Sequence, residues 1–172
     1  MSKKLVRIEP AAGFAPQIGR MVCMLTDVRN GTLASVDGLS MKQLDHLHDA
    51  GSNSIGSLLA HVAAVERIYH VVCFEERHPT ADEEAQVGDA FSLGAGARRT
   101  LCGRTLDHYV DELAAIRRVT LDRLAQRDDE WLERSLAHVP EMNACWAWFH
   151  VIEDEIGHRG QIRWPRSRIP TD

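Results

Sequence analysis

The stretch Cys145-Trp-Ala-Trp-Phe-His-Val-Ile-Glu-Asp-Glu-Ile-Gly-His158 is apolar at helical intervals and carries His150, Asp154 and His158 at four-residue spacing. Each step of four residues advances about 40° around an α-helix and about 6 Å along it, so these three side chains form one stripe. Asp154 and His158 are then able to converge on a common point. Burying such groups in an apolar helix is unfavourable unless a partner satisfies them, and a divalent cation is one such partner.

A second apolar segment supplies a candidate third ligand, His61. It follows Leu58 by three residues and precedes Val65 by four, so it shares a side with core-facing positions. Two imidazoles and one carboxylate suit zinc, nickel, iron or manganese. Three protein ligands would leave at least one position for water or substrate, as in catalytic metal sites. A His-Asp-His hydrogen-bond network without metal would satisfy the same groups, and the spacing alone does not choose between the two interpretations.

The other polar residues near these positions are interpreted more simply. His150 is a hydrogen-bond donor to the ligands, an alternative ligand or a surface residue, and we favour the first role. Glu155 and His158 have the Glu-x-x-His spacing of di-iron bundles, but we find no second copy of that motif. Glu66 and Arg67 are expected to form a charged helix edge. The remaining histidines stand in polar or loop contexts and are expected to be solvated: His46, His48, His70, His78, His108 and His138.

The composition favours a soluble globular protein. A chain of 172 residues, 44% apolar and 26% charged, is long enough for one core and short for two, so we expect a single domain over residues 1–172. No apolar run reaches the length needed to cross a bilayer, and the N-terminal Met1-Ser-Lys-Lys-Leu5 lacks an apolar secretory segment. A cytoplasmic location without membrane association is therefore expected.

Charge and cysteine usage exclude further classes. The formal net charge of -5 argues against nucleic acid as the main partner. The basic run over 159–168 is interpreted as cations near a helix C-terminus, where the helix dipole favours them. The four cysteines include no Cys-x-x-Cys pair, which excludes a zinc knuckle, and we expect them to be reduced and buried: Cys23, Cys73, Cys102 and Cys145.

Helical periodicity predicts an all-α fold. Long helices are expected over about 14–36, 55–76, 105–127 and 143–164, with N-caps at Thr105 and Asn143 and a cluster of capping residues over 51–54. Short helical turns are expected after Ser40 and around Trp131. The polar segment 80–99 is interpreted as a long loop that could cover a pocket mouth. Four helices of this length predict a four-helix bundle, and the long 78–104 connection leaves room for a crossover.

Two segments of the chain resemble the DinB/YfiT-like superfamily of bacterial four-helix proteins. Asn53-Ser-Ile-Gly-Ser-Leu-Leu-Ala-His-Val-Ala-Ala-Val-Glu66 resembles the second helix of that superfamily, and His150-Val-Ile-Glu-Asp-Glu-Ile-Gly-His-Arg-Gly-Gln-Ile162 resembles its last helix. The resemblance implies an antiparallel bundle with a metal near one end, often zinc or nickel, and frequently a homodimer. It places the ligands at His61, Asp154 and His158. The middle ligand is commonly histidine, or glutamate in the mycothiol-dependent maleylpyruvate isomerase branch, so the shorter Asp154 is a departure.

The resemblance also implies a range of activities, including bacillithiol S-transfer, mycothiol-dependent isomerisation and metal-dependent hydrolysis. We expect a metal-dependent enzyme whose small-molecule substrate is a low-molecular-weight thiol held as the nucleophilic thiolate. A hydrolase using the same site, or a non-catalytic bundle that binds a partner, are the alternatives. No residue is identified as a general base.

Overall fold

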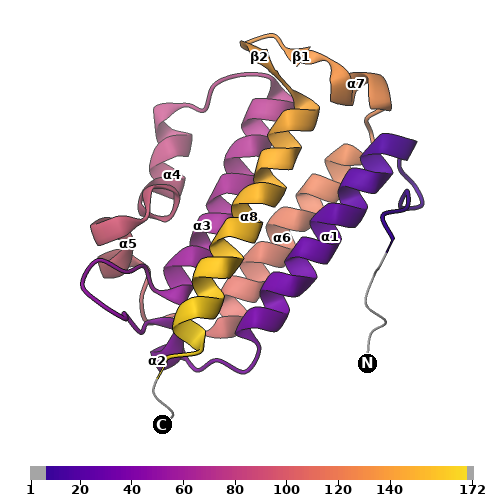
Figure 1. Ribbon diagram of the computed structural model, residues 1–172. Helices are drawn as coiled ribbons and strands as arrows, with labels where there is room; N and C mark the ends of the chain where they lie inside the picture. The colour runs from indigo at the N-terminus through magenta and orange to yellow at the C-terminus, as the bar shows by residue number, and fades with distance from the viewer. Residues whose placement is uncertain (1–6, 170–172) are drawn as a thin grey trace.

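Four long helices form the bundle in the computed structural model, which describes residues 7–169 (Figure 1). They are α1 (Pro16–Val36), α3 (Ile55–His70), α6 (Leu106–Leu124) and α8 (Ala144–Arg166), and the π-helical turn η1 (Val71–Glu75) continues α3. The predicted all-α four-helix bundle is confirmed. Residues 1–5, for which the sequence predicts no apolar secretory segment, lie outside the described residues.

The helices do not follow a simple up-down order. The ends of α1 and α8 meet where Arg166 donates to the backbone oxygen of Ser35, and the ends of α3 and α6 meet where His70 contacts Thr120. Helices α1 and α8 therefore run in one direction and α3 and α6 in the other (Figure 1). Two successive helices in the same direction require a long crossover between them.

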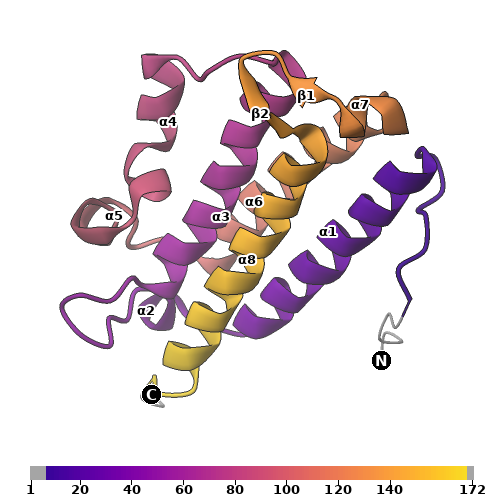
Figure 2. The same cartoon turned by 45° about the horizontal axis from the view of Figure 1, so that its top comes forward.

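That crossover is helical, so the predicted loop over 80–99 is wrong. It contains α4 (Ala81–Ser92) and α5 (Gly94–Thr100), which lie beside α3 on the side away from α1 (Figure 1, Figure 2). Thr80 and Glu83 form a capping box that begins α4 despite its polar sequence. Gly88 interrupts the helix with a φ of 24°, a conformation that L side chains rarely adopt. This short, kinked and largely exposed helix carries little apolar periodicity, which is why the pattern did not reveal it.

Side-chain caps fix the starts of the other helices as the sequence predicts. Ser54, Thr105 and Asn143 each accept a backbone N–H three residues ahead. The expected short turns are α2 (Met41–Leu44) and α7 (Asp129–Glu133). An unpredicted hairpin of β1 (Ser135–Leu136) and β2 (Val139–Asn143) precedes α8, too short for alternation to show in the sequence.

The bundle interior divides into two apolar clusters. One gathers around Trp148 and Phe74, and the other around Tyr109, Leu58 and Ile162. Of the cysteines, all of them free, Cys73 is buried as predicted, but Cys23 and Cys145 are partly exposed and Cys102 is fully exposed. Burial, with the nearby Glu76, raises the pKa of Cys73 to about 12.

A buried ionic network joins all four long helices between these clusters. Arg29 donates to Glu155 at 2.9 Å and to Glu66 at 2.8 Å, and Arg117 donates to Glu66 at 2.7 Å. Burial acts to raise the pKa of Glu66, but Arg117 and Arg29 outweigh it and lower that pKa to about 2. The prediction that Glu66 lies on a charged edge is therefore wrong, whereas its neighbour Arg67 is exposed. The partners of Glu66 come from distant parts of the chain, so no local sequence pattern indicates that this residue is buried.

The continuous helix Ile55–Glu75 is long and apolar enough to cross a membrane by length and composition, so the expectation that no run reaches that length is wrong. However, 78% of its most apolar window is buried inside the bundle. Its apolar side chains are covered by the other helices, as in the central helix of a soluble domain.

The basic run near the C-terminus of α8 serves the end of α1 as well. Arg159 donates to the backbone oxygen of Val28, Arg163 to the hydroxyl of Ser35, and Arg166 to the backbone oxygens of Ser35 and Asp37. Because the last carbonyls of a helix lack partners within it, Arg166 completes the C-terminus of α1, while Arg159 and Arg163 bond other oxygens of the same helix.

Candidate metal site

His61 lies in the second turn of α3 and faces α8. Ser54 caps α3, and the residues around His61 on this helix are almost entirely buried, so the His61 side chain, 11% exposed, is held between helices. Its Nδ1 lies 2.9 Å from the backbone oxygen of Ala90 in α4. A neutral imidazole that donates from Nδ1 keeps the lone pair of Nε2 free to bind a cation.

Asp154 and His158 approach His61 from α8. Oδ1 of Asp154 lies 3.6 Å from Nε2 of His61 and 3.4 Å from Nε2 of His158. The two imidazole rings meet edge to face, with centroids 4.5 Å apart. The sequence therefore identified three side chains that the fold brings together, with one ligand atom from each within 4.8 Å of the others. We call His61, Asp154 and His158 the triad.

The donor set fits a divalent cation. Four ligands at about 2.1 Å around a tetrahedral ion stand about 3.4 Å from one another, close to the two separations from Asp154. Oδ2 of Asp154 is buried and has no hydrogen-bond partner within residues 7–169. Unsatisfied buried polar atoms are unusual and need a partner. The short reach of aspartate is no obstacle here, because one carboxylate oxygen approaches both imidazoles.

Electrostatics within the triad favour the ionised form of Asp154. Burial acts to raise the pKa of Asp154, but His158 and His61 outweigh this effect and hold it well below its usual range. Burial acts to lower the pKa of His61, but the hydrogen bonds that its ring forms to the Asp154 carboxylate and to the backbone oxygen of Ala90 raise it above its ordinary value. A stably ionised carboxylate between two imidazoles is an attractive site for a cation.

Other predicted residues lie outside the triad. The half-buried His150 stacks on Trp146 and pairs with Glu153 at 3.7 Å, rather than donating to the triad. Glu155 faces the ionic network in the core, so the Glu-x-x-His pattern does not form a di-iron ligand pair here.

Two of the histidines expected to be solvated are not: both ring nitrogens of His138 are buried, and His70 is a core residue. His70 is buried, with Nε2 2.7 Å from the hydroxyl of Thr120, which itself donates to Glu66. Burial is the largest of several effects that lower the pKa of His70 to about 4. The hydroxyl proton is committed to Glu66, so His70 is the donor to Thr120 and carries its proton on Nε2.

Helix α4 contributes residues that sequence reasoning missed. The backbone oxygen of Ala90 binds His61, and the ring centroid of Phe91, 43% exposed, lies 6.1 Å from that of His61. Segment 80–99 does cover the triad, as suggested for the predicted loop, but it does so as a helix. An apolar Ala-Phe pair in a polar segment was the one available signal.

A sequence model of the mycothiol S-transferase family matches residues 20–170, a span that includes α3, α6, α8, the triad and all but the first four residues of α1. The chain belongs to the mycothiol S-transferase family. This family is DinB-like, so the resemblance inferred from residues 53–66 and 150–162 is confirmed. No curated protein matches the sequence. Membership of this family implies a small thiol-related substrate.

Proposed function

We propose that this protein is a metal-dependent S-transferase that joins a mycothiol-type low-molecular-weight thiol to an electrophilic small molecule. The triad carries the proposal, because two imidazoles lie 3.6 and 3.4 Å from one carboxylate oxygen in a chain of this family. Zinc or nickel is the favoured ion, with iron or manganese compatible with the same donors. When bound, the cation stabilises the thiolate form of the substrate.

The protein residues have distinct tasks in this reaction. The contact with Ala90 orients His61, and Asp154 supplies the negative charge that holds the cation. The thiol releases its proton to solvent, its sulfur forms a bond to an electrophilic carbon, and the bond from that carbon to the leaving group breaks with its electron pair on the leaving group. The site is narrow, since the side chains of Asp154 and His158 are only 16% and 14% exposed. The reacting sulfur therefore has to enter from the open side of the α3–α8 seam.

The test compares the metal content and the conjugation rate of the purified protein with those of His61→Ala and His158→Ala. Purification omits chelators, and the assay follows mycothiol consumption with a fluorogenic haloalkyl acceptor. Both variants should lose most of their metal and at least a hundredfold in rate, because two protein ligands hold a cation much more weakly than three. His46→Ala, outside the triad, is the matched control. Equal metal content in all four proteins would refute the metal site, and conjugation without metal would refute its role.

The remaining expectations stay predictions. They are the homodimer, the cytoplasmic location, and the absence of nucleic-acid and membrane partners. The hydrolase alternative would use the same triad, so the conjugation assay separates it from the proposed activity.

A further inference from the structure

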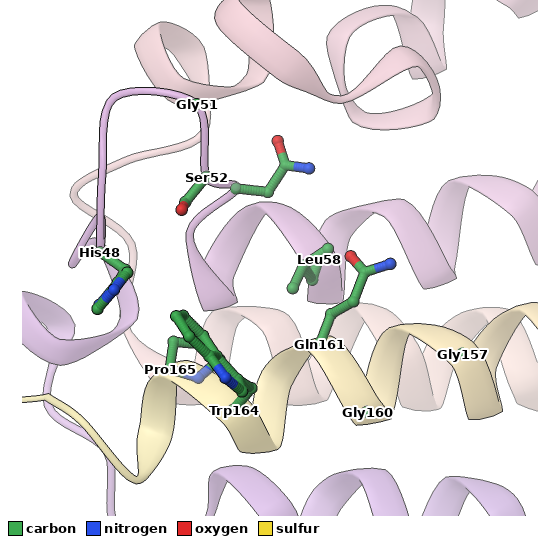
Figure 3. A pocket seen from close by; sticks show the side chains of 10 residues that line it. His48, Gly51, Ser52, Leu58, Gly157, Gly160, Gln161, Trp164 and Pro165 are labelled. Atoms are coloured by element: carbon green, nitrogen blue, oxygen red, sulfur yellow. The ribbon is translucent and has the colours of Figure 1, made fainter.

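Two histidines from distant parts of the chain meet beyond the C-terminal end of α3, whereas His61 lies in the second turn of that helix. His78 lies between η1 and α4, and His138 lies in the turn between β1 and β2, at the same end of the bundle (Figure 1). Their ring centroids are 5.0 Å apart and the ring planes meet at 82°. We call His78 and His138 the histidine pair. It is separate from the cleft beside the triad, where Gln161 of α8 lies opposite Leu58 of α3 (Figure 3).

The ring of His138 has unmet hydrogen-bonding capacity. Both of its nitrogens are buried, and neither has a hydrogen-bond partner within residues 7–169. A neutral imidazole carries one donor and one acceptor, so both kinds of group are unsatisfied here. Such atoms are rare in protein interiors because they lose water without gaining a partner. The edge-to-face contact with His78 satisfies neither nitrogen, so it does not explain a histidine at this position.

The separation of the two rings fits two ligands of one cation. An imidazole nitrogen binds zinc at about 2.1 Å, which places the ring centre about 3 Å from the ion. Two imidazoles on a tetrahedral ion therefore have their centres about 5 Å apart. The centroids of the histidine pair are separated by 5.0 Å. His78 is exposed, so its ring can turn a nitrogen toward such an ion without disturbing the core.

The charges around the histidine pair are compatible with a cation. Burial and the neighbouring His78 lower the pKa of His138, and together they outweigh the opposite effect of Glu76. His138 is therefore held in the neutral form that a metal requires. Arg134 is paired with the carboxylate of Glu76, which offsets the positive charge of the guanidinium close to the pair.

The backbone that leads to His78 is irregular. Helix α3 passes into the π-helical turn η1, and Glu76 then has a φ of 50°, a left-handed conformation that glycine usually takes at a helix end. Both features are over-represented near functional sites. Here they end the helix two residues before His78, which lies against the hairpin turn.

We propose that the histidine pair binds a second divalent cation, which links the β1–β2 turn to the segment that leads into α4. Zinc, nickel and copper(II) are the ions that imidazole ligands suit. Two protein ligands leave the other positions to water, so this site is weaker than the triad and fills only when metal is added. The inference is independent of the proposed function, because the histidine pair and the triad share no residue.

The test counts zinc ions per chain by equilibrium dialysis and elemental analysis, after a chelator has removed all metal. The unmodified protein should bind two ions, and His78→Ala and His138→Ala should each bind one. Because His78 is exposed, His78→Ala should keep the fold. His108→Ala is the matched control: His108 also meets an aromatic ring edge to face, that of Tyr109 at 5.4 Å, but has no histidine partner. This control should bind two ions.

Removing both imidazoles of the triad separates the two sites. The double variant His61→Ala/His158→Ala should retain one ion, and adding His78→Ala to it should leave none. If the triad binds no metal, the unmodified protein and the double variant will both bind one ion and His78→Ala none, which would refute the proposed function alone. An unchanged zinc count in either His78→Ala or His138→Ala would overturn the present proposal.

Hydrogen exchange measured by mass spectrometry locates the second ion. Zinc added beyond the first equivalent should slow amide exchange at least tenfold in residues 76–80 and 137–139 of the unmodified protein, because the ion joins these segments. The same addition should have no effect on either segment of His78→Ala. Exchange in the unmodified protein that does not respond to the second equivalent would also overturn the proposal.

Discussion

Arg29 donates from Nε to Oε1 of Glu155 over 2.9 Å in the bundle interior, and Glu155 directly follows the proposed ligand Asp154. Successive residues of a helix point about 100° apart, so anchoring Glu155 in the core turns Asp154 toward α3. Glu66, the other carboxylate that accepts a hydrogen bond from Arg29, lies on α3 beyond His61. The network thus fixes the rotation of both helices that carry the triad.

Replacing Arg29 with alanine should destabilise the protein by about 3–5 kcal/mol, because two buried carboxylates lose a partner. Urea unfolding followed by circular dichroism measures the free energy of unfolding. The exposed Arg67→Ala is the matched control and should change stability by less than about 0.5 kcal/mol. Similar free energies for the two variants would show that Arg29 does not hold the core together.

Acid should destabilise the protein through His70. Its pKa of about 4 in the folded protein lies below the ordinary value of 6.5, so the unfolded chain binds the proton more readily. Its contribution to stability is complete above pH 6.5 and is lost as the pH falls toward 4, by about 3 kcal/mol in all. Charged neighbours Glu66, Arg67, Arg117 and Arg123 modify this pKa. Thermal unfolding of the protein and of His70→Gln between pH 4 and 7 tests it, and parallel pH profiles would contradict it.

Asp154 should set the affinity for metal through its charge. Asp154→Asn keeps the shape of the side chain and removes the negative charge, so we expect at least tenfold weaker zinc binding in a competition assay with a chromogenic chelator. Asp154→His, which restores the residue common at this position in the superfamily, should retain metal. The neighbouring Glu153→Gln is exposed and serves as the control. An undiminished zinc affinity of Asp154→Asn would show that the carboxylate of Asp154 is not a metal ligand.

Cysteine reactivity should follow exposure and pKa. Cys102 is exposed, whereas Cys73 is buried and has a pKa of about 12, so a thiol reagent at pH 8 should modify Cys102 first and Cys73 only after unfolding. Mass spectrometry of the labelled peptides measures the order. Cys102→Ser should remove the fastest phase. Rapid modification of Cys73 in the folded protein would show that this part of the core opens.

Much of the fold could be predicted from the sequence because helix caps and apolar periodicity depend on residues close together in the chain. Ser54, Thr105 and Asn143 indicate where helices begin, because each forms an N-cap hydrogen bond. The apolar stripes indicate which face of each helix is buried. Helix α4 was missed because it packs few apolar residues and depends on a capping box between Thr80 and Glu83. Apolar periodicity indicates which residues are buried, so a helix that buries few apolar residues is not recognised from it.

The candidate metal site was likewise predictable from the sequence only in part. The spacing of Asp154 and His158 is a property of one helix, so the sequence predicts that they share a face. Whether His61 from another helix meets them depends on the direction and rotation of α3 against α8. The core-facing position of His61 and the family resemblance predicted that pairing, and the structure adds the 3.6 Å approach of His61 to Asp154.

The order of amino acids was thus sufficient to establish a helical bundle, its capped helices and three candidate ligands, because helix periodicity and capping act within a few residues. Packing alone established the crossover through α4 and α5 and the burial of Glu66 and His70. Those features arise from contacts between residues far apart in the chain, whose energies depend on helix directions that no short segment specifies.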